Sequence, residues 1–122
     1  MKNTIFLCSL NEIPETGAKG IKFFADSDKD DIFLVRSPDD GQVLAYWNSC
    51  PHIPGSPLGW AKNRYLNRAQ DTIVCSSHGA LFNLVDGHCF SGPCIGEKLI
   101  PVPLHIDEHN RLYLIKTSEK LT

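Results

Sequence analysis

Short runs of apolar residues, rich in β-branched and aromatic side chains, recur along the chain. They cover residues 5–7, 21–24, 32–35 and 43–47. Clusters of Asp, Ser, Pro and Gly lie between them, notably at 26–31 and 37–41. Such clusters favour turns with the acidic side chains in solvent. Runs of this length and spacing predict an antiparallel meander of β-strands.

The C-terminal part of the chain shows period-two alternation on both sides of a polar segment. Apolar residues occupy every second position over 102–106 and, after the polar stretch 107–110, again at Leu112 and Leu114. Two alternating segments joined by a short polar loop predict a β-hairpin.

The arrangement of these runs predicts an all-β fold. The chain has 122 residues, the length of one domain, and shows no long stretch of 3.6-residue periodicity. Residues 48–62 are dense in Pro and Gly. We therefore predict a single domain over 1–122, with an antiparallel β-sandwich, or alternatively a small barrel, as its base. Residues 48–96 would form a loop-built subdomain inserted in this base.

Composition narrows the function and the compartment. The net charge of −2 leaves no basic footprint for nucleic acid. The first eight residues are too short an apolar stretch for a signal peptide, and no segment reaches membrane-spanning length. These features predict a cytoplasmic protein without nucleic-acid or membrane partners. In a reducing compartment, an odd number of cysteines, five, favours metal ligands or free thiols over a disulfide framework.

Two cysteine–histidine pairs are the candidate metal ligands. Cys50 and His52 are separated only by Pro51, and Cys75 and His78 by two serines. Thiolates and imidazoles together select zinc, copper or iron–sulfur centres over calcium or magnesium. Zinc sites usually place two to four residues between paired ligands, which the first pair does not. Each segment supplies one thiol and one imidazole, as suits two irons bridged by two loops, and two His replacing two Cys on one iron distinguish a Rieske centre.

The chain resembles the Rieske ferredoxin family over most of its length. The resemblance is carried by the two pairs, by the segment 79–82 after the second pair, by Asp86-Gly87, by Ser91-Gly92-Pro93 and by the terminal hairpin, all in family order. It implies that this chain binds a Rieske [2Fe-2S] cluster. In that resemblance Cys50 and Cys75 hold the inner iron, His52 and His78 hold an outer iron near the surface, and Ser91-Gly92-Pro93 forms a loop that covers the cluster.

Departures from the family pattern point to a low-potential member. High-potential Rieske proteins carry hydroxyl donors at the positions of Ala80 and Phe82, and neither of these side chains can donate a hydrogen bond. They also carry a disulfide between the positions of Gly55 and Ser77, which cannot form here. We therefore expect a potential toward the low end of the Rieske range, as in soluble ferredoxins.

Three cysteines and one insertion have no counterpart in the family pattern described above. Cys89 and Cys94 have a spacing that permits a local disulfide, but buried free thiols are the favoured interpretation, as for Cys8. An insertion around Lys62 to Gln70 makes the separation of the two pairs longer than in small family members. No role follows for it from the sequence.

The predicted function is that of a one-electron carrier and not of an enzyme by itself. The chain shows no nucleotide-binding fingerprint and no region that would build a catalytic mononuclear iron site. The resemblance implies a reductase as electron donor and an acceptor such as a ring-hydroxylating oxygenase. Two alternatives remain open: a redox or oxygen sensor using the same cluster, and a structural zinc-binding module using the same four ligands.

Overall fold

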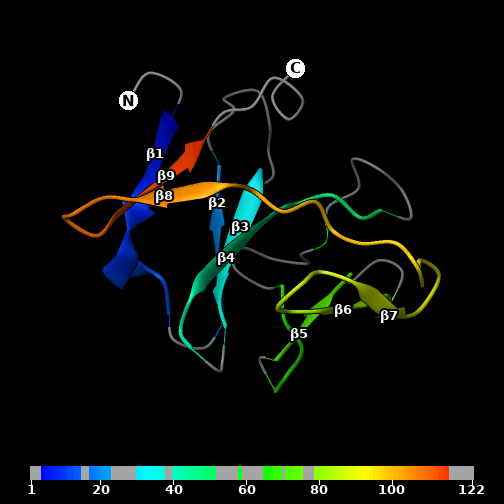
Figure 1. The fold of residues 1–122 in the computed structure, drawn as a ribbon. Coiled ribbons are helices and arrows are strands. Elements are labelled where there is room, and N and C mark those ends of the chain that lie inside the picture. The colour runs from blue at the N-terminus through cyan, green and yellow to red at the C-terminus, as the bar shows by residue number, and fades with distance from the viewer. Residues whose placement is uncertain are drawn as a thin grey trace.

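The structure is a computed structural model that describes residues 4–14, 17–22, 30–37, 40–51, 58, 65–69, 71–75 and 79–115. This part of the chain forms three antiparallel sheets of three strands each (Figure 1). The elements are β1 (Thr4–Ser9), the short 3-10 helix η1 (Leu10–Glu12), β2 (Ala18–Ile21), β3 (Ile32–Arg36), β4 (Val43–Trp47), β5 (Thr72–Val74), β6 (Leu81–Asn83), β7 (Cys89–Ser91), β8 (Leu104–Ile106) and β9 (Arg111–Ile115). The prediction of an all-β fold is confirmed. No helix in the described residues is long and apolar enough to cross a membrane.

Two sheets, β1–β9–β8 and β2–β3–β4, build the base and share an apolar core. Its buried members are Cys8, Ile13, Ile32, Leu34, Val43, Ala45, Val102, Leu112 and Leu114. The stretch 100–106 joins the sheets, because Val102 N–H donates to Ala45 O (2.9 Å) at its start and β8 pairs with β9 at its end. Non-directional burial of these side chains from water stabilises the base.

The sheet order differs in one respect from the predicted meander. Of the four strands β1 to β4, only β2, β3 and β4 follow one another as neighbours. β1 pairs instead with β9, from Thr4 opposite Ile115 to Ser9 opposite Arg111. The hairpin β8–β9 has the predicted alternation, with Leu112 and Leu114 buried. β1 completes this hairpin from the other end of the chain, which local spacing could not reveal.

Strand β3 is buried on both faces. None of the side chains over 32–35 has exposed surface, which explains the unbroken apolar run in the sequence. Ile32 and Leu34 belong to the base core, while Phe33 and Val35 belong to a second core. Since side chains alternate between the faces of a strand, β3 is shared by two hydrophobic cores.

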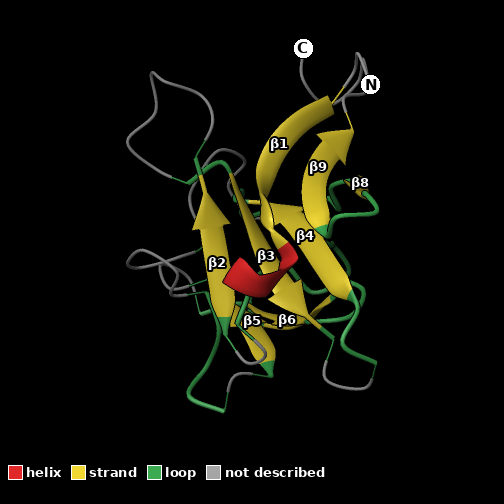
Figure 2. Ribbon diagram, turned by 90° about the vertical axis from the view of Figure 1, so that its left-hand side faces the viewer, coloured by secondary structure: helices red, strands yellow, loops and turns green. Residues whose placement is uncertain are grey.

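The third sheet, β5–β6–β7, lies at the other end of the molecule from β1–β9–β8 (Figures 1 and 2). Its strands of three residues are too short to give a periodic signal, so the region predicted as loop-built also contains a small sheet. The turn between β6 and β7 is held by two side-chain acceptors. Asn83 Oδ1 accepts from Val85 N–H (3.0 Å), and Asp86 Oδ1 accepts from His88 N–H (2.9 Å).

The described part of the insertion extends this sheet. Leu66 forms a bridge with Ile73 of β5, and backbone hydrogen bonds flank it, from Asn67 N–H to Thr72 O and from Val74 N–H to Tyr65 O (both 2.9 Å). Asn67 Oδ1 also accepts from Asp71 N–H (3.1 Å) and closes the turn. Residues 65–67 therefore run along β5 as an additional partner.

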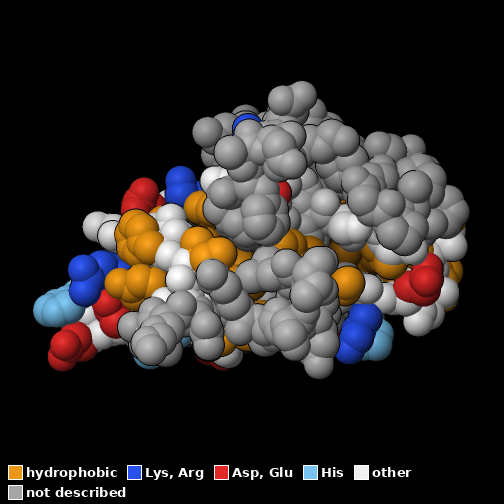
Figure 3. Space-filling model, turned by 90° about the horizontal axis from the view of Figure 1, so that it is seen from above, with side chains coloured by type: hydrophobic (Ala, Val, Ile, Leu, Met, Phe, Trp, Pro, Cys, Tyr) orange, Lys and Arg blue, Asp and Glu red, His pale blue; other side chains and the backbone are white. Residues whose placement is uncertain are grey.

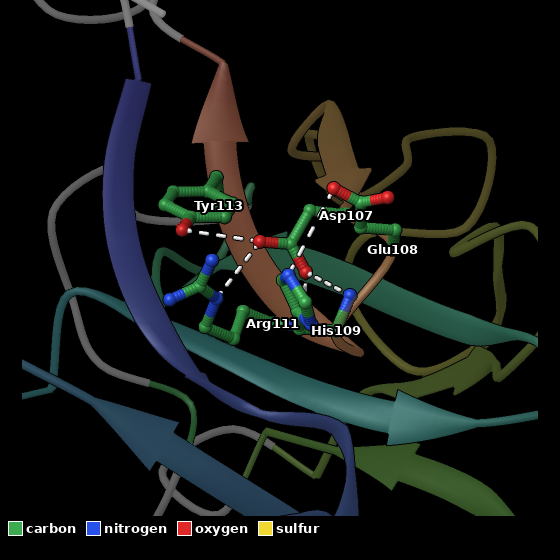
Figure 4. A network of polar contacts seen from close by, with 5 residues as sticks. All are labelled: Asp107, Glu108, His109, Arg111 and Tyr113. Atoms are coloured by element: carbon green, nitrogen blue, oxygen red, sulfur yellow. Dashed lines mark hydrogen bonds and ion pairs between the residues drawn. The ribbon is translucent and has the colours of Figure 1, made fainter.

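The β8–β9 turn is organised by a single carboxylate (Figure 4). Asp107 Oδ1 accepts from the backbone N–H groups of His109 and Arg111 (both 2.9 Å), and Oδ2 accepts from Arg111 Nε (2.8 Å) and Tyr113 OH (3.4 Å). Partial burial alone would raise the pKa of Asp107, but the hydrogen bonds from Arg111 and His109 outweigh it and lower the pKa to about 2. Figure 3 shows charged side chains of both signs beside hydrophobic ones at this end of the molecule.

Candidate metal centre

Two of the four predicted ligands come to one core from the ends of two strands. Cys50 follows β4 and Cys75 directly follows β5. Both side chains have no exposed surface and both belong to the second core, together with Phe33 and Phe82. Neither takes part in a disulfide. The fold thus buries two sulfur donors from distant segments in one hydrophobic environment.

Asn48 fixes the start and the end of the segment that carries Cys50. Its backbone N–H donates to Asp31 O (2.9 Å), and its Nδ2 donates to Asp30 O (2.9 Å). Its Oδ1 accepts from Leu58 N–H (2.8 Å), and the Leu58 side chain is fully buried. One amide side chain therefore ties residue 58 back to the end of β4, and sequence reasoning did not identify it.

The segment after β5 is closed by two short backbone bonds. Cys75 N–H donates to Ala80 O (2.9 Å), and Gly79 N–H donates to Cys75 O (2.8 Å). Gly79 has φ +73, a conformation that side chains disfavour. Ala80 and Phe82, which stand where high-potential relatives have hydroxyls, are both fully buried.

The segment 91–93 packs directly on this closure. A Cβ added to Gly92 would lie 2.7 Å from Ala80 Cα, closer than such atoms can approach, and Gly92 has φ +99. Only glycine brings the two backbones this close. Gly92 thus lies against the backbone that follows Cys75, and the covering of a cluster by this loop stays a prediction.

Cys94, after that loop, belongs to the same core as Cys50, and its side chain is 1% exposed. Burial, followed by the neighbouring thiols of Cys89 and Cys50, raises the pKa of Cys94 to about 12. Cys89 and Cys94 are not joined by a disulfide, and the Cys89 thiol donates to Ser91 O (3.3 Å).

Two tyrosines attach the second core to the base. Tyr46 on β4 donates to Leu84 O (2.9 Å), and Tyr65 donates to Asp30 Oδ2 (2.7 Å) while its ring stacks on Phe33 (4.3 Å between centroids, 9° between planes). The expectation that the acidic cluster 26–31 lies in solvent is wrong for Asp30, which accepts this buried hydroxyl. Tyr65 also gives the insertion a role, because it anchors that segment to β3.

The donor chemistry of the described residues fits a soft metal centre. The buried thiols of Cys50 and Cys75 share one core with those of Cys89 and Cys94. His52 and His78 lie outside the described residues, as do Gly55 and Ser77. Within the described residues no group of three or more His, Cys, Asp or Glu side chains is placed to hold a metal ion, and two of the four predicted ligands are not among them.

The chain belongs to the Rieske [2Fe-2S] domain family, since the family model matches residues 3–110. The predicted resemblance is therefore confirmed. The cofactor of this family is a Rieske [2Fe-2S] cluster, in agreement with the predicted cofactor. A search of curated proteins found no match.

Solved structures with the same fold include electron carriers and a subunit of a larger enzyme. The ferredoxin of carbazole 1,9a-dioxygenase from Nocardioides aromaticivorans IC177 is similar at 18% identity, with a TM-score of 0.66, covering 95% of this chain and 100% of that chain. A putative NADH-dependent nitrite reductase small subunit from Mycobacterium tuberculosis is similar at 19% identity, with a TM-score of 0.63, covering 94% and 96%. A chain in a complex of reduced oxygenase and oxidised ferredoxin in carbazole 1,9a-dioxygenase matches at 17% identity, with a TM-score of 0.65, covering 94% of each chain.

Proposed function

We propose that this chain is a one-electron carrier that binds a Rieske [2Fe-2S] cluster through Cys50, His52, Cys75 and His78. The two cysteines would bind one iron and the two histidines the other. An electron would arrive from a reductase and pass to an acceptor protein such as an oxygenase. The observation that carries the proposal is the burial of Cys50 and Cys75, from two distant strand ends, in one core.

The described residues support this function by what they do around the two thiols. The cluster, when bound, supplies reversible storage of one electron. Asn48 and the Cys75–Ala80 bonds hold the backbone on either side of the thiols, so their position is set before any metal binds. Gly92 packs on Ala80, whose side chain is fully buried in the same core as the two thiols. Solvent exclusion and hydrogen bonds to sulfur are the main protein levers on the potential of such a centre.

The similar structures support a role in electron transfer and leave two settings for it. One is a separate ferredoxin that serves an oxygenase, as in the ferredoxin of carbazole 1,9a-dioxygenase and in the complex of oxygenase and ferredoxin. The other is a small subunit held in a larger enzyme. In both settings the domain passes electrons between proteins. Size-exclusion chromatography of the native protein distinguishes them, because a separate ferredoxin elutes alone and a subunit elutes with its partner subunits.

The cofactor is tested on protein purified without oxygen. Iron, sulfide and zinc are measured on one sample, with visible absorption and low-temperature electron paramagnetic resonance before and after dithionite. About two irons and two sulfides per chain, and a resonance that appears on reduction, are expected for the cluster. One zinc per chain and no resonance would instead establish the structural zinc module. A sensor would differ from a carrier in binding its partner with an affinity that depends on oxidation state.

The ligands are tested by substitution with a matched control. Cys75→Ala should abolish the cluster, whereas Cys8→Ala removes an equally buried thiol from the base core and should retain it. His52→Cys or His78→Cys should lower the midpoint potential if a cluster assembles, because thiolate replaces neutral imidazole. A full cluster in Cys75→Ala, or an unchanged potential in both histidine variants, would contradict the ligand assignment.

A further inference from the structure

Asp30 lies where the chain enters β3, and it is bonded to two other segments. Its backbone O accepts from Asn48 Nδ2 (2.9 Å), and its carboxylate Oδ2 accepts from the Tyr65 hydroxyl (2.7 Å). Asn48 precedes Cys50 by two positions, and Tyr65 lies in the insertion. One residue therefore joins the segment of a predicted iron ligand to the insertion, for which the sequence alone indicated no role.

Gly20 of β2 makes room for this carboxylate. It lies opposite Phe33 in the β2–β3 pair, so side chains at these two positions project from the same face of the sheet. A Cβ added to Gly20 would overlap the Asp30 side chain, which supplies its three nearest atoms. Gly20 is not among the glycines with positive φ. Alanine at this position would therefore meet the carboxylate without straining its own backbone.

The Tyr65 ring is held in place separately from its hydroxyl. The side chain is buried and stacks on Phe33, with 4.3 Å between the ring centroids and 9° between the planes. Burial, followed by the hydrogen bond to Asp30 and the charge of Asp30, raises the pKa of Tyr65. The hydroxyl thus keeps its proton and remains a donor. Since a buried hydroxyl without its acceptor costs free energy, the stacked ring favours one position of the Asp30 carboxylate.

Asn48 connects Asp30 to the segment that carries Cys50. Its side chain is held between Asp30 O and Leu58 N–H, and the bond from Leu58 to Asn48 Oδ1 is 2.8 Å. A shift of residue 30 would therefore disturb the bond at residue 48 and, through the same amide group, the bond at residue 58. Cys50 lies between these two positions in the sequence.

We propose that Asp30 is a positioning residue for the metal centre, which links Tyr65 of the insertion to Asn48 and thereby fixes the backbone that carries Cys50. The inference rests on the proposed function, in which Cys50 binds iron. Hydrogen bonds connected in this way support one another, because each group orients the next. The insertion thus slows loss of the cluster through a hydroxyl that does not itself bind metal.

The first test compares Tyr65→Phe with Tyr46→Phe. Both variants remove one buried hydroxyl from the second core and keep the ring, but the Tyr46 hydroxyl donates to Leu84 O instead. Exchange of the Leu58 amide hydrogen, measured by mass spectrometry on the loaded protein, should be roughly three- to tenfold faster in Tyr65→Phe than in wild type. Visible absorption should also be lost faster. At equal global stability, set with urea, Tyr46→Phe should match wild type in both rates.

The second test breaks the same bond without altering either of its partners. Gly20→Ala should displace the Asp30 carboxylate and speed both rates as Tyr65→Phe does. The double variant should be no faster than the faster single variant, because both substitutions remove one interaction. Asp30→Asn keeps an acceptor for the Tyr65 hydroxyl and should therefore stay closer to wild type than Asp30→Ala.

The outcomes separate this inference from the proposed function. Equal rates in Tyr65→Phe and Tyr46→Phe, or additive effects in the double variant, would overturn the role of Asp30. Faster exchange at Leu58 without faster loss of absorption would also overturn it, because the link would not reach the metal centre. Wild type with zinc in place of iron and sulfide would overturn the carrier function, whereas faster exchange at Leu58 in Tyr65→Phe would still support the link through Asp30.

Discussion

Ile32 and Leu34 of β3 contribute to an aliphatic core, whereas Phe33 and Val35 of the same strand contribute to a core with aromatic rings and four cysteines. All four side chains are fully buried. The base core is closed by apolar contact between two sheets. The second core also depends on directional bonds, such as those from Tyr46 to Leu84 and from Tyr65 to Asp30.

Because of this difference, the base core mainly determines the stability of the fold, whereas the second core also determines the positions of the two thiols. Apolar burial is non-directional, so the base can be altered without moving the two thiols. The second core instead positions them through a few hydrogen bonds and one close backbone contact. Substitutions of similar cost should therefore have different effects on the metal centre, depending on the core in which they fall.

The largest expected effect comes from truncating adjacent residues on the two faces of β3. Leu34→Ala and Phe33→Ala should each lower the free energy of unfolding by about 2–5 kcal/mol, measured by urea denaturation. Phe33→Ala should in addition speed the loss of visible absorption of the loaded protein, because the stacked partner of Tyr65 is gone. If the two variants lost their visible absorption at equal rates when compared at equal stability, the second core would have no special role in holding the metal centre.

A smaller effect is expected from two glycines with similar backbone angles. Gly92 has φ +99 and Gly96 has φ +95, so alanine is strained at both. An added Cβ at Gly96 meets nothing within 4 Å, whereas at Gly92 it meets the Ala80 backbone. Gly92→Ala should therefore cost about 1–3 kcal/mol more than Gly96→Ala in urea denaturation and lower iron content per chain. If both variants lost the same free energy of unfolding and kept the same iron content, the loop at Gly92 would be able to shift without affecting the metal centre.

The smallest expected effect is on the stability of the fold at acidic pH, through Asp107 in the β8–β9 turn. The folded-state pKa of Asp107 is lowered to about 2, so its contribution to stability is complete above its ordinary value of 3.8 and is lost as pH falls toward 2. In Asp107→Asn, thermal unfolding should depend less on pH across this window, while iron content at neutral pH stays unchanged. A pH profile identical to wild type would show that the turn network contributes nothing measurable.

The base was largely predictable because its strands are periodic. The runs at 32–35 and 43–47 and the alternation on both sides of 107–110 mark β3, β4 and the β8–β9 hairpin. The pairing of β1 with β9 was not predictable, since it joins the two ends of the chain. The strands β5 to β7 were missed because three residues do not define a period.

For the site, the sequence identified the ligand candidates but not their support. Asn48, Tyr65 and Asp30 act through partners far along the chain, at separations of 10 to 35 residues.

The small β5–β6–β7 sheet has a further property. Leu66 bridges to Ile73 along β5, and residues 97–99 hydrogen-bond to Gly87 and Cys89 beside the start of β7. Backbone groups at these edges are therefore already paired within the chain, which protects against edge-to-edge aggregation. A partner that meets this part of the molecule cannot add a strand along these stretches. It must recognise side chains and surface shape, a mode that permits brief contact and rapid release.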